Sequence, residues 1–94
     1  MGDELGWWVV LQVTLMDPGR VVMMIKGTTL PFVPMEGLRL IFEGFSFTIQ
    51  DLEWNQKERT FRAYTKSESF LVGGMDSAIE AYKKVGFGIV EPRA

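Results

Sequence analysis

The sequence contains no cysteine and no histidine. Without cysteine, the chain cannot form disulfides, cannot use a thiolate nucleophile and cannot build most structural zinc sites. Without histidine, it lacks the usual general base and the commonest metal ligand at neutral pH. These two absences predict a non-catalytic protein that uses no metal and no cofactor.

The chain also lacks a strong charge of one sign and a long hydrophobic run. Its net charge is −2 and its pI is about 5.0, so it has no overall basic character for nucleic acid. The longest apolar run, residues 7–11, is too short to span a bilayer. The acidic first residues do not match a secretory signal. The sequence therefore predicts a cytoplasmic protein without a membrane partner.

Hydrophobic residues make up 47% of the 94 residues, which predicts one folded domain over residues 1–94. Alternating runs of β-branched and aromatic residues predict strands at 6–15, 21–27, 38–44, 45–54 and 59–66, with a short one at 87–90. One helix is predicted at about 76–85. Short connections favour antiparallel pairing. The predicted fold is α+β, with a curled, partly barrel-like antiparallel sheet of five to six strands and one helix in the C-terminal half.

The segment 45–54 has an irregular pattern. Phe45, Phe47 and Ile49 share one parity, whereas Leu52 and Trp54 have the opposite one. The apolar residues of a regular strand cannot change faces. We therefore expect a β-bulge near residues 50–51, because one extra residue shifts the parity by one.

A proline-containing apolar segment, TLPFVPMEG at 29–37, separates the second and third predicted strands. Pro31 and Pro34 lack a backbone N–H, so the segment should be extended without forming a central strand. We expect it to cross an open end of the sheet, with Leu30, Phe32 and Val33 filling the core. The alternative is that it forms the rim of a binding site.

The second predicted strand is apolar on both faces. One helix of about ten residues is only about 15 Å long and cannot cover both faces of the sheet. The leftover apolar face predicts a homodimer, for which two-fold symmetry is the common closed form. The predicted dimer contacts are Trp8, Val10, Val22 and Met24.

Basic and aromatic side chains gather in the second half of the chain. The hypothetical binding residues are Phe32, Trp54, Arg59, Arg62, Tyr64 and Lys66. We expect first a small binding or interaction protein whose partner is a protein or a small apolar ligand. The alternative is single-stranded nucleic-acid binding through residues 57–66, because such a strand could stack bases and hold phosphates. Arginine and lysine on an exposed strand also keep it soluble and unpaired.

Three runs carry a resemblance: LPFVPMEGLRLIF at 30–42, FTIQDLEW at 47–54 and RTFRAYT at 59–65. With the following helix and VGFGIV at 85–90, they resemble small bacterial orphan proteins of mobile gene cassettes, which have a Leu-Pro-Phe-x-Pro-x-x-Gly segment between β-hairpins. The resemblance covers residues 30–90. It implies a compact, oligomeric, non-enzymatic protein with a partner still to be found, and it implies no cofactor and no functional residue.

Overall fold

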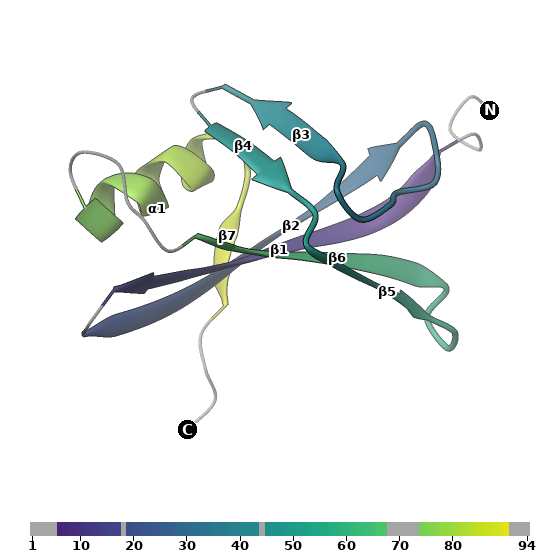
Figure 1. Ribbon diagram of the computed structural model, residues 1–94, viewed down its shortest axis with the longest axis horizontal. Helices are drawn as coiled ribbons and strands as arrows, with labels where there is room; N and C mark the ends of the chain where they lie inside the picture. Colours follow the sequence, from purple (N-terminus) through teal and green to yellow (C-terminus); the bar gives the residue numbers. More distant parts are fainter. Residues whose placement is uncertain (1–5, 18, 44, 68–73, 91–94) are drawn as a thin grey trace.

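The computed structural model describes residues 6–17, 19–43, 45–67 and 74–90 (Figure 1). Seven strands and one helix follow one another in the order β1 (Trp7–Asp17), β2 (Arg20–Leu30), β3 (Arg39–Phe42), β4 (Phe45–Thr48), β5 (Asp51–Asn55), β6 (Thr60–Ser67), α1 (Gly74–Lys84) and β7 (Gly88–Val90). Five strands form a large sheet in the order β5-β6-β1-β2-β7, and β3 and β4 form a small sheet. The predicted α+β class with one helix in the C-terminal half is confirmed.

The large sheet is mixed, not wholly antiparallel. The hairpins β1–β2 and β5–β6 are antiparallel, as their short connections predict, but β6 lies beside β1 and runs parallel to it. This parallel pair joins segments far apart in the sequence, so no local pattern indicates it. The sheet is open, with β5 and β7 at its edges, and does not close into a barrel.

The hydrophobic core lies on one side of the large sheet, which we call the inner face. The centre of this face is a row of fully buried side chains from β1: Val9, Leu11, Val13 and Leu15. Both α1 and the small sheet lie on this side of the large sheet (Figure 1). The helix buries Met75, Ile79 and Tyr82, whose spacing places them on one helical face.

The change of parity in residues 45–54 reflects a change of sheet. The Ile49 N–H donates to the Leu38 carbonyl at 2.9 Å, beside the small sheet, while the Gln50 N–H donates to the Tyr64 carbonyl of β6 at 2.9 Å. The register pairs Asp51 with Tyr64 as well. Residues 49 and 50 belong to neither strand, so the parity changes where the chain passes from β4 to β5. The single strand expected at 45–54 with a bulge near 50–51 is instead two strands in different sheets.

A cluster of aromatic rings fastens the small sheet to the helix. Phe45 lies 4.1 Å from Tyr82, and Phe42 lies 5.2 Å from Phe45 and 5.9 Å from Phe87, measured between ring centroids. Phe87 also lies 6.3 Å from Phe47, a fully buried side chain of β4. These contacts join β3, β4, α1 and the approach to β7 in one core.

The segment between β2 and β3 departs from the sequence prediction. Leu30 and Pro34 are buried, but Phe32 is 46% exposed and Val33 is exposed as well. Leu30 lies on the inner face with its β1 partner Trp7, and the three side chains between Leu30 and Pro34 face solvent. The expectation that Phe32 and Val33 fill the core is wrong, and the segment presents apolar side chains on the surface.

Candidate functional site

Three aromatic side chains form a continuous row at one end of the inner face. We call Trp7, Trp54 and Phe61 the aromatic surface. The Phe61 ring lies 4.8 Å from Trp54 and 6.0 Å from Trp7, between centroids. Trp7 is 42% exposed and Trp54 is 43% exposed, whereas Phe61 is half-buried between them. The row therefore presents two indole rings to solvent, supported by a third ring beneath.

Strand register explains why these rings meet. Trp54 pairs directly with Phe61 across β5 and β6, and Val9 pairs with Phe61 across β1 and β6. Trp7 precedes Val9 by two residues, so it lies on the same face. The row thus crosses three neighbouring strands, β5, β6 and β1.

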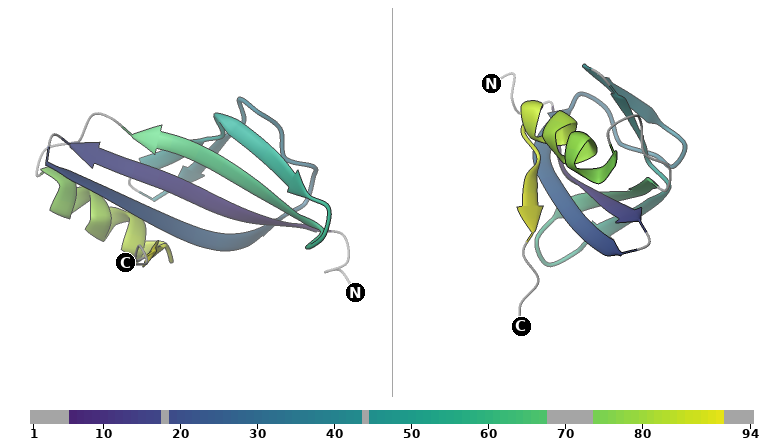
Figure 2. Two further views of the ribbon diagram at one scale, coloured as in Figure 1. Left: turned by 90° about the horizontal axis from the view of Figure 1, so that it is seen from below. Right: turned by 90° about the vertical axis from the view of Figure 1, so that its left-hand side faces the viewer.

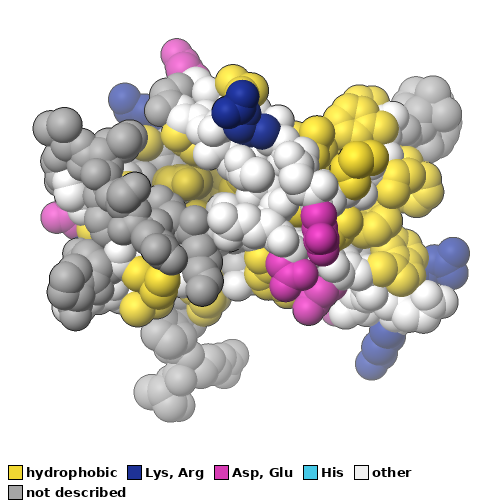
Figure 3. Space-filling view, in the orientation of Figure 1, with side chains coloured by type: hydrophobic (Ala, Val, Ile, Leu, Met, Phe, Trp, Pro, Cys, Tyr) yellow, Lys and Arg dark blue, Asp and Glu magenta, His cyan; other side chains and the backbone are white. Residues whose placement is uncertain are grey.

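Further exposed apolar side chains lie near this row. Trp7 pairs with Leu30, the last residue of β2, and the exposed Phe32, Val33 and Met35 follow within the next few residues. Figure 3 shows hydrophobic side chains gathered on the right-hand side of the molecule, over the segment between β2 and β3 and over the ends of β5 and β6. An apolar area of this kind is typical of an interaction surface.

The turn between β5 and β6 holds Trp54 in place. The Trp54 indole N–H donates to the Gln56 side-chain oxygen at 2.8 Å. The Asn55 side chain accepts the Glu58 N–H at 2.8 Å, and the Asn55 carbonyl accepts the Arg59 N–H at 2.7 Å. Arg59 closes the turn with a φ of 57°, a left-handed conformation that side chains other than glycine adopt rarely. Arg59 is exposed and lies two residues before Phe61 of the aromatic surface.

The predicted binding residues do not gather at one place. Phe32, Trp54 and Arg59 lie at the aromatic end, whereas Arg62 and Tyr64 point to the opposite, outer face of the large sheet, because Phe61 and Ala63 point inward. The side chain of Lys66 lies outside the described residues. Trp7 and Phe61 belong to the aromatic surface but are not among the predicted binding residues. The sequence shows that Trp7 lies on the same face as Val9 and that Phe61 lies on the same face as Ala63. It does not show that β1 and β6 are neighbours.

On the outer face, Arg62 and Tyr64 already have partners. The Arg62 guanidinium donates to the Gln12 side-chain oxygen at 3.0 Å, and the Tyr64 hydroxyl donates to the Glu53 carboxylate at 2.8 Å. Burial raises the pKa of Tyr64, and the hydrogen bond to Glu53 raises it further. Glu53 pairs with Arg62 and Asp51 with Tyr64, so carboxylates interleave with the basic strand. This arrangement gives little support to phosphate binding there.

The four predicted dimer contacts do not share a face. Trp8 and Val10 lie on the outer face, but Val22 and Met24 are buried in the core of the inner face. Because Asp17 pairs with Arg20, every odd residue of β1 pairs with an even residue of β2, as Leu15 does with Val22. The even residues of β2 therefore share the inner face with the odd residues of β1. The expected grouping is therefore corrected, and the outer face of β2 carries Val21, Met23 and Ile25 instead. The Pro18-Gly19 dipeptide, which favours a tight turn, was the signal in the sequence for this register.

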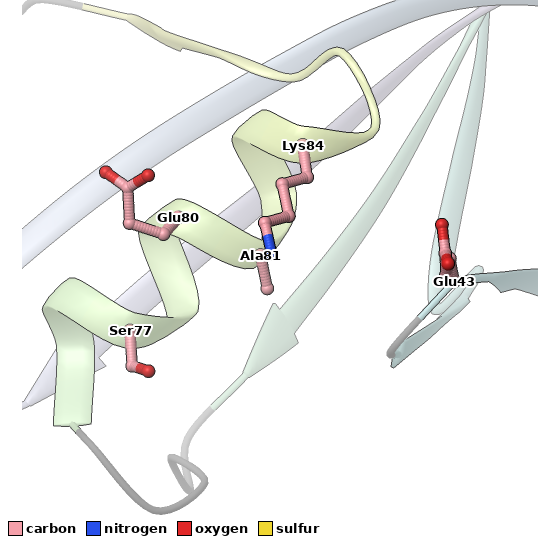
Figure 4. A pocket seen from close by; sticks show the side chains of 5 residues that line it. All are labelled: Glu43, Ser77, Glu80, Ala81 and Lys84. Carbon is pink, nitrogen blue, oxygen red and sulfur yellow. The ribbon is translucent and has the colours of Figure 1, made fainter.

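A surface hollow of about 390 Å³ lies between α1 and the turn that joins β3 to β4, lined by Glu43, Ser77, Glu80, Ala81 and Lys84. Its charged groups do not converge, because the carboxylate of Glu80 points away from Glu43 (Figure 4). Within the described residues, no three acidic side chains come close enough to hold a metal ion. The hollow therefore lacks the paired groups that acid–base or metal chemistry requires.

No protein-family model matches the chain, and no curated protein or solved structure matches it. The resemblance to gene-cassette proteins, with the bacterial origin and the cytoplasmic location, stays a prediction from the sequence. None of the helices in the described part of the chain is long and apolar enough to cross a membrane.

Proposed function

We propose that this chain is a small, non-catalytic binding protein that acts as a homodimer and holds an apolar partner on the aromatic surface. The observation that carries the proposal is the row of Trp7, Phe61 and Trp54, in which contacting rings leave both tryptophans more than 40% exposed. Its partner is a small apolar ligand or an apolar segment of another protein.

Physical chemistry supports this use of the row. Large rings bury much apolar area on contact and lose few rotamers, so tryptophan is enriched where binding energy concentrates. The supporting ring of Phe61 and the hydrogen bond from Trp54 to Gln56 hold Trp54 in one orientation before any partner arrives. Such preorganisation lowers the entropic cost of binding.

Binding of anilinonaphthalene sulfonate, an aromatic dye that fluoresces on apolar surfaces, tests the proposal. We expect the folded protein to bind the dye, and Trp54→Ser to weaken binding about tenfold, equivalent to about 1.4 kcal/mol. Ile41→Ser is the matched control, because Ile41 is also an exposed apolar residue but lies on β3. Unchanged binding by the Trp54→Ser protein, or equal loss in the control, contradicts the proposal.

The same titration includes oligothymidylate, a single-stranded DNA probe, at several salt concentrations. The proposed function predicts no salt-dependent binding. Affinity that falls steeply with salt and with Arg62→Ala supports nucleic-acid binding through residues 57–66 instead, since phosphate contacts release counterions.

The homodimer is the second part of the proposal. The large sheet has one face covered by α1 and the small sheet and one face with half-buried apolar side chains that no described element covers. A sheet facing water on one side normally alternates apolar and polar residues more cleanly. Light scattering should give the mass of a dimer at tens of micromolar, and a monomer mass at that concentration contradicts this part.

A further inference from the structure

The outer face of the large sheet carries an apolar stripe. It is defined by Trp8 and Val10 of β1 and by Val21, Met23 and Ile25 of β2, which share one face by register. Trp8 is 52% exposed and Val21 is 63% exposed, while the other three are half-buried. The helix and the small sheet lie on the other side of the sheet (Figure 2). Within the described residues, no helix or strand covers this stripe.

The part of the outer face formed by β5 and β6 is polar, and its neighbour Gln12 of β1 bonds to both sides. Gln12 accepts a hydrogen bond from Arg62 at 3.0 Å and donates to the Met23 sulfur at 3.6 Å. Tyr64 is bonded to Glu53 at 2.8 Å. These bonds give Arg62, Tyr64 and Glu53 partners within one chain, so a partner on the stripe need not supply them. The polar half forms one border of the stripe.

Trp8 has a fixed place on the stripe because of Gly27. A side chain at position 27 would overlap the six-membered ring of Trp8, so the indole lies directly over the backbone of Gly27. An aromatic ring covering a glycine of the neighbouring strand is a recurrent stabilising device in sheets. It leaves a flat, ordered and half-exposed ring at one end of the stripe.

We propose that a second copy of this chain packs on the stripe, outer face against outer face; this rests on the homodimer of the proposed function. An isologous contact needs only one self-complementary patch, and the stripe has one chemical character along its length. A two-fold axis through the stripe places apolar β2 residues against their counterparts and keeps both polar halves at the rim. Such an apolar centre with a polar rim is the usual anatomy of an interface.

The size of the face fits a dimer. The eleven-residue strands β1 and β2 are about 36 Å long and the eight-residue strand β6 is about 26 Å long, at about 3.3 Å per residue and 4.8 Å between strands. Contact over these three strands buries roughly 470 Å² on each copy, or roughly 900 Å² in total, which is close to the lower limit of about 1,000 Å² for a specific interface.

A pair of charge substitutions tests the face. Val21→Lys and Ile25→Lys place cations near the two-fold axis, where each meets its counterpart, so we expect the dimer dissociation constant to rise more than about tenfold. Val21 is mostly exposed, so its substitution leaves the fold intact even if Ile25→Lys does not. Ile41→Lys, on the small sheet, is the matched control and should leave the dissociation constant unchanged. The measurement is sedimentation equilibrium, with thermal unfolding as the check on folding.

The fluorescence of Trp8 gives a second readout. In a chain with Trp7→Phe and Trp54→Phe, Trp8 is the remaining tryptophan, and its quenching by acrylamide should fall as protein concentration rises through the dissociation constant.

The outcomes separate the two proposals. A wild-type chain that is monomeric throughout overturns the homodimer itself. A wild-type dimer that keeps its affinity in both lysine variants and leaves Trp8 equally quenchable overturns only the assignment of the face. Weaker dimerisation in the two stripe variants, with Ile41→Lys unchanged and Trp8 protected, supports the inference.

Discussion

The ring of Phe87 lies edge to face against the ring of Tyr82, with 5.1 Å between centroids, and the Phe87 N–H donates to the Tyr82 carbonyl at 3.1 Å. The next bond, from the Gly86 N–H to the Lys83 carbonyl at 3.0 Å, completes a Schellman motif. The same short stretch therefore ends the helix, turns the chain towards β7 and adds a ring to the core. It couples a local backbone motif to the packing of both sheets.

Phe87→Ala should lower the free energy of unfolding by about 3–5 kcal/mol, because it removes a buried ring that contacts four other aromatic rings. Urea unfolding monitored by tryptophan fluorescence measures the change. Phe32→Ala is the control and should cost less than about 1.5 kcal/mol, since the Phe32 ring is half exposed. An equal loss of unfolding free energy in the two variants would show that the Phe32 ring is packed as tightly as the Phe87 ring.

Gly86→Ala should cost about 1–2 kcal/mol. Gly86 has a φ of 103°, where a β-carbon is strained, and the added atom would also displace the flexible end of Lys26. Gly88→Ala is the matched control, because Gly88 lacks a positive φ and nothing lies within 4 Å of its missing β-carbon. Thermal unfolding of both variants should separate them, and a neutral Gly86→Ala would contradict the Schellman geometry.

Arg59→Gly should raise the free energy of unfolding by about 0.5–1 kcal/mol. Glycine adopts the left-handed φ of 57° without strain, so the substitution removes the strain that the arginine backbone carries there. This gain exceeds the loss of stability that comes from the larger conformational entropy of glycine in the unfolded chain. Lys57→Gly in the same turn should instead destabilise slightly, because Lys57 does not have a positive φ. Chemical denaturation distinguishes the signs, and the idea fails if both glycines act alike.

Stability should decline at alkaline pH through Tyr82. Burial raises the pKa of Tyr82 above the ordinary tyrosine value of 10.0. Above that pH the unfolded chain loses the phenolic proton while the folded chain keeps it, so the free energy of unfolding falls until pH passes the folded pKa. Below pH 10.0, both states hold the proton and Tyr82 contributes no slope.

Urea unfolding between pH 9 and 11, about the ordinary pKa near 10, measures this slope. Tyr82→Phe should reduce the slope, and Tyr64→Phe should reduce it less, because Tyr64 is far more exposed than Tyr82 and its raised pKa therefore has a smaller effect. A wild-type slope that Tyr82→Phe leaves intact would mean that another group controls alkaline unfolding.

Much of the local structure could be predicted from residue patterns. Alternation in β1 and β6 identified the strands, and the broken parity at residues 50–51 identified an irregularity where the chain leaves the small sheet for the large one. These features depend on neighbouring residues. Strand periodicity and turn chemistry are short-range properties, so they are visible in the sequence.

The candidate site was harder to predict from the sequence. Trp54 and Arg59 were singled out from the sequence, but Trp7 and Phe61 join them only because β6 lies parallel to β1. Met23 and Ile25 replace Met24 and Val22 on the outer face because of the hairpin register. A one-residue difference in register moves a side chain to the opposite face, so small errors of pairing rearrange a predicted site entirely.

The sequence by itself determined the α+β class, the single helix in the C-terminal half and the positions of most strands, because these follow from local hydrophobic period. Only the tertiary structure decided that β3 and β4 form a separate sheet, that Phe32 is exposed, and that three aromatic rings from β1, β5 and β6 meet. The physical reason is that strand neighbours and covered faces depend on contacts between residues far apart in the sequence. The energies of these contacts compete across the whole chain, so they produce no repeating pattern of residues that could be recognised locally.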